Sequence, residues 1–597
     1  MSDYKVNYKV RKNFTTDPSR ALQEILENRG VENVNDYINP TEECEFDPFL
    51  LEYVKEGVEM LHKHLERRSK ILMVVDSDTD GVTSSSVLWL YIKQWYPEAN
   101  LSFTVHEGKQ HGLDDKIDWI EEQDFNLIIC PDSASYDKEE MERIIAKGAE
   151  VLVLDHHEPL LNEDGSIHML YNPHAVIINN QLSPNYLNKS LCGAGVVYKF
   201  CEALDTTFSR ADAQNYLDLV ALGEIADVMF QGTSETRYLI TEGLKNIRND
   251  GFKALLEAQA FSLKDKAQEP YYGLTPIDVA FYIGPLINAI TRVGTLQERE
   301  NLFLAFIDPL RKVQSTKRGA KEGDWEYACQ QNARVAGNAR NRQNKAKERA
   351  IEILEARAQK EGLLDNNVII IPVEPEDKIP QELTGLIAMA FVSKYGKPCL
   401  IGRVNDNDAL QGSIRNNENF EALPALKSYL EETGLFSFVA GHENSAGFGI
   451  QEDKVSTFIS LVNKQFSPDD FQNCYLVDYA LDAYDIELNP LFMILAQHPE
   501  YFGNGVDEIK VVVKGIKVSS PFFMGANKDS TKISCNGIDY VRFKDENFVE
   551  AVKMFNGGEM MVMGRLNLNT FAGKTSVQLF IDDYEFVKNK TDHRFDF

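Results

Sequence analysis

Residues 71–85, ILMVVDSDTDGVTSS, join an apolar run to three closely spaced carboxylates. The run 71–75 is apolar and partly β-branched, which is typical of a buried parallel strand. Asp76, Asp78 and Asp80 follow at alternate positions, and Gly81 can then take a turn. Charges of one sign at this spacing repel one another unless a cation lies between them. The stretch therefore predicts a strand followed by a loop that holds a hard divalent metal ion.

Two other interpretations of this loop compete with the metal site. D-x-D-x-D-G also begins the calcium loop of an EF-hand, which needs a bidentate Glu at its twelfth position. Counted from Asp76, the twelfth residue is Val87, and a strand rather than a helix precedes the loop. Both observations argue against the EF-hand. A solvated acidic turn without metal stays open from this stretch alone.

The bulk composition limits the class of protein. A chain of 597 residues predicts several domains, and 43% hydrophobic residues suffice for folded cores. The net charge of −30 argues against nucleic-acid binding by the whole surface, so such a site must be a local basic groove. The eight cysteines form no C-x-x-C pair, which favours a reduced, cytoplasmic protein. The N-terminus lacks the apolar core of a signal peptide, and no apolar run is long enough for a membrane span.

Strands and helices alternate from residue 71 to about 230, which predicts a doubly wound α/β sheet. Three apolar runs (71–75, 127–130 and 151–154) are each followed directly by ionisable side chains. The second is followed by Asp132 and the third by Asp155, His156 and His157. Ligands of open α/β sheets bind beyond the carboxyl ends of the strands. The three sets of side chains are therefore expected to converge on one site.

A fourth contribution is expected from residues 216–229, YLDLVALGEIADVM, which have helical spacing. Asp227 stands near the end of this segment, where it is either a metal ligand or a local cap. The other three clusters favour the ligand. A set of carboxylates with imidazoles prefers Mg²⁺ or Mn²⁺, with imidazole favouring Mn²⁺. There are enough ligands for two ions that share a carboxylate, the arrangement used to hydrolyse phosphate esters.

The rest of the chain carries weaker signals. Residues 311–360 hold thirteen Lys/Arg against six Asp/Glu and include a long helix, which is either a solvated connector or a basic face along a phosphate backbone. From residue 368 a second α/β pattern begins and runs to a Gly-rich turn at 441–449. Residues 460–590 are β-rich and suit a small OB-type barrel. Its mixed lysines and aromatics either bind single strands or are an ordinary edge surface.

Several ordered motifs together resemble the DHH phosphoesterase superfamily, in particular its RecJ-like single-strand DNA exonucleases. The motifs in the first half are VVDSDTDGVTSS, the Asp132 run, LDHHEP, LCGAGVVYKFCEAL, LGEIADV and LINAITRVG. Those in the second half are LTGLIAMAFVSKYGKP, GSIRN, AGHENSAGFGI, YFGNGVDE and VQLFIDDY. The resemblance covers nearly the whole chain. One departure is Ala134, because the family has Gly two residues after the Asp of the second motif.

The resemblance implies roles for individual residues. Two ions, Mn²⁺ or Mg²⁺, would be held by Asp76, Asp78, Asp80, Asp132, His156 and Asp227. Asp155, His156 and His157 are the predicted catalytic residues, with Asp155 orienting a histidine and His157 facing the scissile phosphate. Arg292, Ser413 and Arg415 match residues that grip a 5′-terminal phosphate, a task that suits fork-shaped Arg contacts. His442 matches the residue that closes over the nucleotide, and Asn288 in LINAITRVG is also a predicted substrate-binding residue.

The resemblance also implies an organisation and a function. We expect metal-dependent 5′→3′ hydrolysis of single-stranded DNA to mononucleotides, in recombination, repair or replication. Expected partners are single-stranded DNA and a single-strand-binding protein or helicase, for a monomer that does not enter membranes. The alternatives are a phosphoesterase of small molecules or oligonucleotides and a non-catalytic replication scaffold. The predicted parts are an N-terminal helical cap (1–70), a DHH catalytic domain (71–310), a basic connector helix (311–362), a smaller α/β DHHA1 domain (363–460) and an OB-like domain (461–597).

Overall fold

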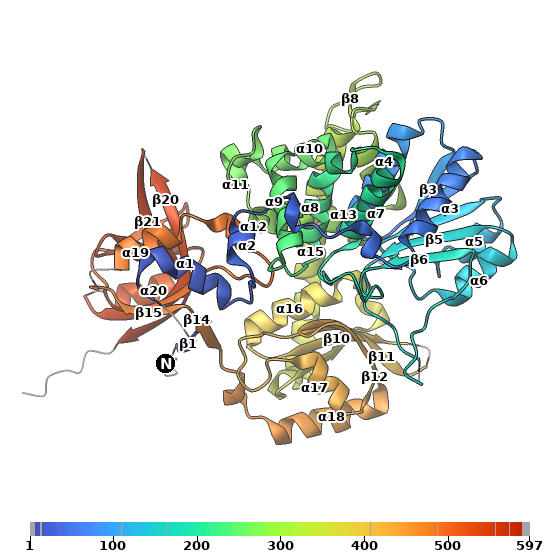
Figure 1. Ribbon diagram of the computed structural model, residues 1–597. Coiled ribbons are helices and arrows are strands. Elements are labelled where there is room, and N and C mark those ends of the chain that lie inside the picture. The colour runs from blue at the N-terminus through green and yellow to red at the C-terminus, as the bar shows by residue number, and fades with distance from the viewer. Residues whose placement is uncertain are drawn as a thin grey trace, which may run out of the picture. The chain divides into compact units, whose positions relative to one another are not determined.

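Figure 1 shows the computed structural model of the chain. The structure describes residues 6–11, 15–108, 110–162, 164–405, 407–485, 488–555, 557–571 and 573–587. The chain divides into two compact units. We call Gly30–Asn344 with Glu500–Val506 the site unit, and Met1–Arg29, Lys345–Pro499 and Asp507–Phe597 the companion unit. No described helix is both long enough and apolar enough to cross a membrane.

The site unit is built on a parallel sheet of five strands. Their order across the sheet is β3-β2-β4-β5-β6, and every neighbouring pair is parallel. The strands are β2 (Ile71–Val75), β3 (Leu101–Val105), β4 (Leu127–Pro131), β5 (Glu150–Asp155) and β6 (Ala175–Asn179). After β3 the chain crosses back over β2 to form β4, so the strand order reverses at β2. Such a reversal opens a crevice at the carboxyl end of the strand, where ligands bind.

Alternate residues of β2 face two different cores. Ile71, Met73 and Val75 pack into a core that contains α3 (Val54–Glu66), α4 (Thr79–Trp95) and α7 (Gly193–Phe208). Leu72 and Val74 pack into the opposite core with α5 (Ile117–Glu121) and α6 (Lys138–Ala146). Side chains of a strand alternate between its faces, so a strand covered on both faces must be apolar throughout. The prediction of a doubly wound α/β sheet is confirmed.

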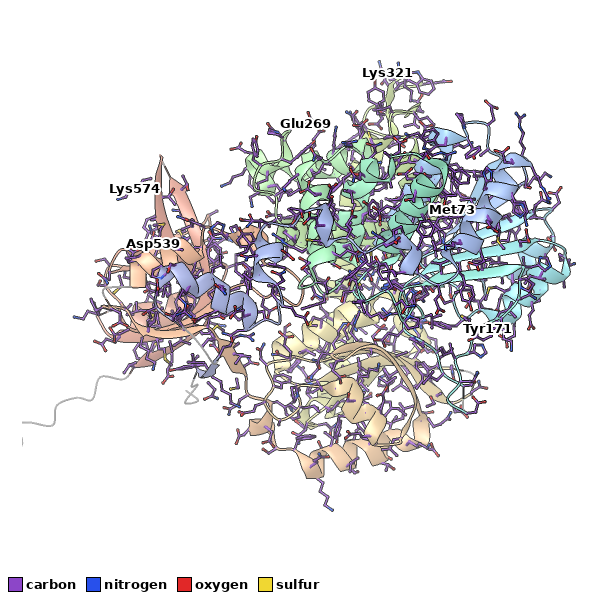
Figure 2. All side chains as sticks on the ribbon, in the orientation of Figure 1. Met73, Tyr171, Glu269, Lys321, Asp539 and Lys574 are labelled. Atoms are coloured by element: carbon purple, nitrogen blue, oxygen red, sulfur yellow. The ribbon has the colours of Figure 1, made fainter. Side chains whose placement is uncertain are left out.

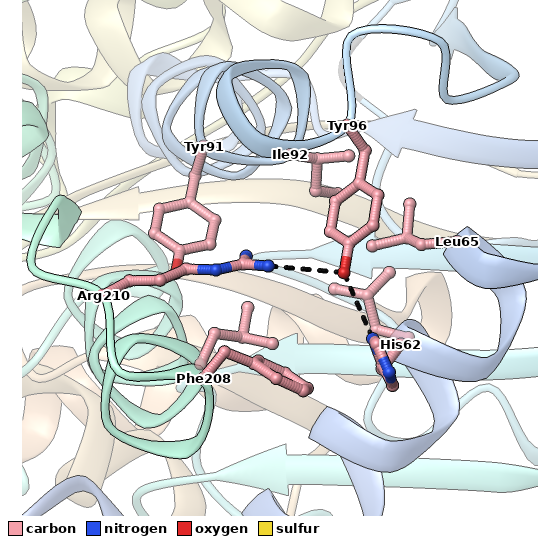
Figure 3. A pocket seen from close by; sticks show the side chains of 9 residues that line it. His62, Leu65, Tyr91, Ile92, Tyr96, Phe208 and Arg210 are labelled. Atoms are coloured by element: carbon pink, nitrogen blue, oxygen red, sulfur yellow. Dashed lines mark hydrogen bonds between the residues drawn. The ribbon is translucent and has the colours of Figure 1, made fainter.

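The far end of α4 is fixed by polar contacts around Tyr96. The Nη2 of Arg210 donates to the Tyr96 hydroxyl at 3.4 Å, and the Nδ1 of His62 lies 3.2 Å from the same oxygen (Figure 3). The Arg210 guanidinium also stacks over the ring of Trp95, 4.2 Å from its centroid. These contacts hold the C-terminal end of α4, while its first turn belongs to the loop after β2. The helix therefore holds that loop in a fixed position.

Helices and one hairpin complete the site unit. The helices are α8 (Leu217–Ala226), α9 (Ser234–Lys245), α10 (Asp250–Ala258), α11 (Ala260–Leu263), α12 (Pro276–Tyr282), α13 (Gly284–Val293) and α14 (Leu296–Ile307). Strands β7 (Lys312–Gln314) and β8 (Trp325–Tyr327) form an antiparallel hairpin before the long helix α15 (Ala328–Lys360). The sequence predicts α15 but not the hairpin, since strands of three residues leave no readable alternation.

The companion unit holds two large sheets and one pair of strands. The first has the order β12-β13-β11-β10-β9, from β9 (Ile369–Pro372), β10 (Cys399–Val404), β11 (Ala409–Arg415), β12 (Phe436–His442) and β13 (Ser445–Gln451), with α16 (Thr384–Tyr395) between β9 and β10. This is the predicted second α/β unit. The Gly-rich stretch 441–449 is mostly strand, with the turn confined to Glu443 and Asn444. Its glycines therefore lie in a hairpin rather than in an open loop.

The β-rich C-terminal part is a seven-stranded sheet of order β15-β16-β20-β21-β19-β18-β17. Its strands are β15 (Tyr479–Asp482), β16 (Lys510–Lys517), β17 (Phe522–Met524), β18 (Ser530–Cys535), β19 (Ile538–Arg542), β20 (Glu559–Phe571) and β21 (Lys574–Val587). Within the predicted helical cap, β1 (Asn7–Val10) is a strand that pairs in parallel with β14 (Cys474–Val477). The five-part division of the chain stays a prediction.

Candidate metal centre

Three neighbouring strands of the site unit deliver their ionisable residues to one edge of the sheet. Asp76 follows β2, Asp132 follows β4, and Asp155 ends β5 directly before His156 and His157. β4 lies between β2 and β5, and paired strands are about 4.8 Å apart. The backbone positions that follow β2 and β5 are therefore only two strand spacings apart. The predicted convergence of the three sets is present in the structure.

Asp78 and Asp80 begin helix α4 instead of lying in an open loop. Asp78 is the N-cap, and its side chain accepts a hydrogen bond from the Gly81 amide at 3.0 Å. Asp80 is buried in the first turn and accepts from the amides of Gly193 (2.5 Å) and Ala194 (3.0 Å) at the start of α7. Free amides and the helix dipole make a helix N-terminus a good partner for a carboxylate. These hydrogen bonds compensate part of the charge of Asp80, although burial still raises the pKa of this carboxyl group.

Glycines create the room for these carboxylates. A Cβ on Gly81 would lie 2.5 Å from the Cβ of Asp76, and one on Gly193 would lie 2.6 Å from the Oδ1 of Asp132. A Cβ on Gly223 would lie 2.6 Å from the Oδ1 of Asp80. The expectation that Gly81 takes a turn is wrong: it lies inside α4, and its function is close approach to the Asp76 backbone. Glycine is needed here for space and not for a left-handed backbone.

His156 lies between carboxylates from three elements. Its Nε2 is 3.2 Å from Asp132 Oδ1, 3.5 Å from Asp227 Oδ2 and 3.8 Å from Asp80 Oδ2. Asp227 caps the C-terminal end of α8, as its predicted position near a helix end requires. Among the described residues, the groups whose ligand atoms are close enough to hold a metal ion are Asp76/Asp78/Asp132, Asp80/His156/Asp227 and Asp132/His156/His157. Asp132 belongs to two of these three groups.

The electrostatics of the centre favour a bound cation. Burial raises the pKa of Asp132 well above its ordinary value, and the neighbouring Asp80, Asp78 and Asp76 raise it further. Burial and Asp80 likewise raise the pKa of Asp227. The buried Oδ1 of Asp132 accepts no hydrogen bond from any described residue. A buried carboxylate without a donor is costly, and a divalent ion removes that cost. The donor set, oxygen with one or two imidazoles, fits Mn²⁺ or Mg²⁺.

Asp155 and His157 form a separate hydrogen-bonded pair. Asp155 Oδ1 lies 2.7 Å from His157 Nδ1, and the same carboxylate accepts from the amides of Ser135 and His156. Burial alone would raise the pKa of Asp155, but the charge of His157 and these hydrogen bonds outweigh it and hold the pKa well below its usual range. The negative charge of Asp155 raises the pKa of His157 to about 10. The imidazole is half-exposed at the edge of the centre.

Asn288 and Arg292 occupy one face of α13, since they are four residues apart. The Thr79 hydroxyl donates to the Oδ1 of Asn288 at 3.0 Å, which fixes α13 against the first turn of α4. Burial lowers the pKa of Arg292, and the negative charge of Asp78 opposes this shift. The structure therefore brings these two predicted residues to the edge of the carboxylate cluster.

Ser413, Arg415 and His442 lie on the first sheet of the companion unit. Ser413 and Arg415 share one face of β11, and Arg415 is paired with Ser445, which is in turn paired with His442. Arg415 and His442 are thus two strands apart in one ladder, about 10 Å between Cα atoms. A Cβ on Gly385 of α16 would lie 2.5 Å from the Arg415 guanidinium, so this glycine makes room for the Arg. The register therefore places the three predicted residues on one face of this sheet.

Two histidines of the centre are missing from the sequence-based predictions. His106 directly follows β3, is fully buried, and has its Nε2 3.8 Å from Asp76 Oδ1. His111 places its Nδ1 2.5 Å from Asp76 Oδ2. The signal was present in the sequence, because residues 101–105 are a fourth strand whose carboxyl end is also followed by ionisable side chains. That strand begins with an exposed, alternating pattern and not with an apolar run, so its end is harder to recognise.

Comparisons with known proteins identify two domain families in this chain, relatives in sequence and one solved structure of the same fold. The DHH family, N-terminal domain, matches residues 70–224, and the RecJ OB domain matches residues 477–583. YorK of the SPbeta prophage of Bacillus subtilis, named as a single-strand DNA-specific exonuclease, is 34% identical over 591 residues and 97% of each chain. RecJ of Escherichia coli is 23% identical over 89% of this chain and 90% of its own. The Mn²⁺ complex of RecJ from Thermus thermophilus has a TM-score of 0.71 at 19% identity, over 98% of this chain and 80% of that one, which shows a shared fold.

Proposed function

We infer the function of this chain from its family: it belongs to the RecJ-like single-strand DNA-specific exonucleases of the DHH family. It is an enzyme of this class, and we propose that it hydrolyses single-stranded DNA from the 5′ end to mononucleotides with two divalent ions. The observation that carries the proposal is the presence of two ligand groups, Asp76/Asp78/Asp132 and Asp80/His156/Asp227, beside the buried Oδ1 of Asp132, which accepts no hydrogen bond from a described residue.

One ion would be held by Asp76, Asp78 and Asp132, and the other by Asp80, His156 and Asp227. Asp132 would be shared with the second ion, because its Oδ1 lies 3.2 Å from the Nε2 of His156. Mn²⁺ or Mg²⁺ fits this donor set, and Thermus RecJ has been solved with each of them. When bound, a pair of such ions supplies an activated water and charge stabilisation for phosphodiester hydrolysis. The chain contributes the spacing of the ligands, through glycines that allow carboxylates from different elements to approach.

His157 is the proposed residue that faces the scissile phosphate. Asp155 accepts a hydrogen bond from its Nδ1, so the ring is oriented and its Nε2 is directed away from Asp155. The positive charge that Asp155 favours on this ring suits a group that stabilises an anionic phosphate or donates a proton to a leaving oxygen. Asp155 is in this proposal a positioning residue, as its buried carboxylate holds both the loop and the ring.

The direction of cleavage would follow from a clamp on a terminal phosphate. Two separate sets of residues are proposed to bind this phosphate: Arg292 and Asn288 in the site unit, and Ser413, Arg415 and His442 in the companion unit. Guanidinium groups bind phosphate oxygens in pairs, which suits a 5′ phosphate better than an internal one with fewer free oxygens. A held end would present one nucleotide at a time to the metal centre. A role in recombination, repair or replication, together with a single-strand-binding protein or helicase, is part of the same proposal.

The test is digestion of single-stranded DNA, labelled at either end, in Mn²⁺. The proposal expects immediate release of labelled mononucleotide from the 5′-labelled strand and late release from the 3′-labelled one. Duplex DNA and a dinucleotide are run beside it, because preference for the dinucleotide would indicate a small-molecule phosphoesterase. Asp80→Ala is expected to abolish release. Unchanged release by that variant would contradict the site, and no release by the wild type would indicate a non-catalytic scaffold.

A further inference from the structure

The hairpin β7–β8 of the site unit is unexplained by the metal centre. Its tip carries Lys321, which Figure 2 labels at the outermost part of this projection. Five Lys/Arg and three Asp/Glu lie in residues 311–327 of a chain whose net charge is −30. The hairpin is therefore a basic projection on an acidic protein, and a partner of negative charge is the one it can attract.

One face of the hairpin is aromatic and exposed to solvent. The pairing places Lys312 opposite Tyr327 and Gln314 opposite Trp325. These four side chains share the outer face, since Val313 and the buried Glu326 occupy the other. Trp325 is 62% exposed and Tyr327 40% exposed. Two aromatic rings two residues apart on one strand, beside a lysine, form a platform on which flat groups can stack.

The hairpin is ordered by its own contacts. Buried Glu326 accepts hydrogen bonds from both Nη atoms of Arg334 on α15, at 2.7 and 2.9 Å. Its Oε1 also accepts from the amide of Thr316 at 3.1 Å. The Gln314 side chain donates to the carbonyl of Lys321 and accepts from the amide of Gly323, which closes the tip. A platform ordered before binding loses little conformational entropy when a ligand stacks on it.

The cations on the hairpin are available to a ligand. Arg311, Lys312, Arg318 and Lys321 are exposed, and none of them has an ion-pair partner among the described residues. Lys317 is the exception, with its Nζ 3.6 Å from the Oε2 of Glu326. Free cations around exposed aromatic rings are the combination that binds single-stranded nucleic acid without sequence preference.

The hairpin is also tied to the helices that lead to the metal centre. Arg342 of α15 pairs with Glu298 at 2.7 Å. Glu298 forms the capping box of α14 with Thr295, three residues after Arg292. The platform and the proposed phosphate-binding Arg thus belong to one continuous set of packed helices within the site unit.

We propose that Trp325 and Tyr327, with the lysines around them, bind single-stranded DNA outside the metal centre by stacking its bases and pairing with its phosphates. This inference rests on the proposed function, because it takes the same substrate. It adds a second contact that holds the strand at a distance from the reacting end. A second contact would raise the affinity for long strands and the number of nucleotides removed per encounter.

The test compares full-length variants in EDTA, with a fluorescent polythymidine strand of about 40 nucleotides. Trp325→Ala/Tyr327→Ala is expected to bind at least about thirtyfold more weakly, since each lost stack lowers affinity at least about fivefold. Trp325→Phe/Tyr327→Phe keeps the rings and is expected to bind within about twofold of the wild type. Phe261→Ala/Tyr272→Ala removes two rings that are 99% and 83% exposed elsewhere in the site unit and is the matched control.

Each outcome decides for or against the inference. Loss of single-strand affinity in the alanine double variant alone, with a wild-type melting temperature, supports it. Wild-type affinity in that variant, an equal loss in the matched control, or a loss confined to duplex DNA would overturn it. A wild type that digests single strands while all variants bind normally refutes only the hairpin contact. A wild type that neither binds nor digests single strands refutes the proposed function as well.

Discussion

Gly193→Ala is the substitution that tests the metal centre most directly. Gly193 is the first residue of α7, and a Cβ there would lie 2.6 Å from both the Cβ and the Oδ1 of Asp132. Ordinary Cβ contacts begin near 3.4 Å, so one of the two groups must move by about 0.8 Å. Asp132 has little freedom to move, because its amide donates to the Leu154 carbonyl at 2.7 Å and its φ is +65°.

A displacement of this size is expected to reduce the hydrolysis rate about a hundredfold, since misplacing a catalytic group by about 1 Å has that effect. Overpacking is expected to cost about 1–3 kcal/mol of stability, which leaves the protein folded at 25 °C. Because Asp132 belongs to two of the ligand groups, the Mn²⁺ concentration needed for half-maximal rate should also rise. The assays are release of mononucleotide over a Mn²⁺ titration and thermal unfolding.

Gly337→Ala is the matched control, because Gly337 lies in α15 and no atom is within 4 Å of its added Cβ. It is expected to keep the wild-type rate and to gain about 0.5–1 kcal/mol of stability, as Gly does when replaced by Ala in a helix. If Gly193→Ala is folded and keeps both the rate and the Mn²⁺ dependence of the wild type, Asp132 is not a ligand at this position. The proposed sharing of Asp132 would then be refuted.

Three further predictions concern stability. In EDTA, Asp132→Asn is expected to melt about 2 °C or more above the wild type, because it removes a buried carboxyl group whose pKa burial has raised. Excess Mn²⁺ should make the wild type the more stable protein, and the same order of melting temperatures in both conditions would contradict this prediction. Ala134 has a φ of +76°, a left-handed backbone conformation that strains residues with a Cβ. Ala134→Gly should change the free energy of unfolding in urea by less than about 1 kcal/mol, whereas Ala134→Val should lower it by more than about 2 kcal/mol. Equal stability of the two variants would refute backbone strain at this position. Hydrogen bonds from Arg334 outweigh burial and lower the pKa of Glu326 from 4.5 to about 2. The ionised Glu326 therefore contributes to the free energy of unfolding, by about 1–2 kcal/mol after a discount for solvent screening. This contribution is full above pH 4.5 and is lost as the pH falls toward 2. The stability difference between wild type and Glu326→Gln should therefore be constant from pH 8 to 5 and shrink below 4.5, and a difference that is independent of pH would contradict it.

The sequence predicts the sheet and the carboxylate cluster because both follow from local patterns. Apolar runs identify β2, β4 and β5, and parallel strands bring their carboxyl ends to one edge whatever the details of packing. The sequence-based prediction is wrong for Gly81 and does not mention Gly193. The function of these glycines depends on which atoms from other parts of the chain lie close to them in the fold. His106 and His111 follow a strand with a half-exposed face, so the rule that finds the other ligands is harder to apply to them.

The clustering of Ser413, Arg415 and His442 shows another limit of sequence reasoning. Their neighbourhood depends on the register of β11 against β13 and of β13 against β12. A shift by one residue would turn Ser413 and Arg415 to the other face of the sheet. Such a register is set by the type and length of the turns, and the sequence alone does not identify it here. The resemblance to the family, and not the residue pattern, predicts that these three residues act together.

Two buried carboxylates of the centre, Asp80 and Asp132, have different hydrogen-bond partners, and the difference bears on how the site works. Asp80 receives two amide hydrogen bonds from the start of α7, whereas the Oδ1 of Asp132 receives none from the described residues. Asp132 also approaches that helix start, because Gly193 has no Cβ to exclude it. The helix thus satisfies one carboxylate and leaves the other for a cation. Burying the ionised Asp132 destabilises the folded protein, and a bound ion removes this cost. Metal affinity and stability are therefore linked at this one side chain.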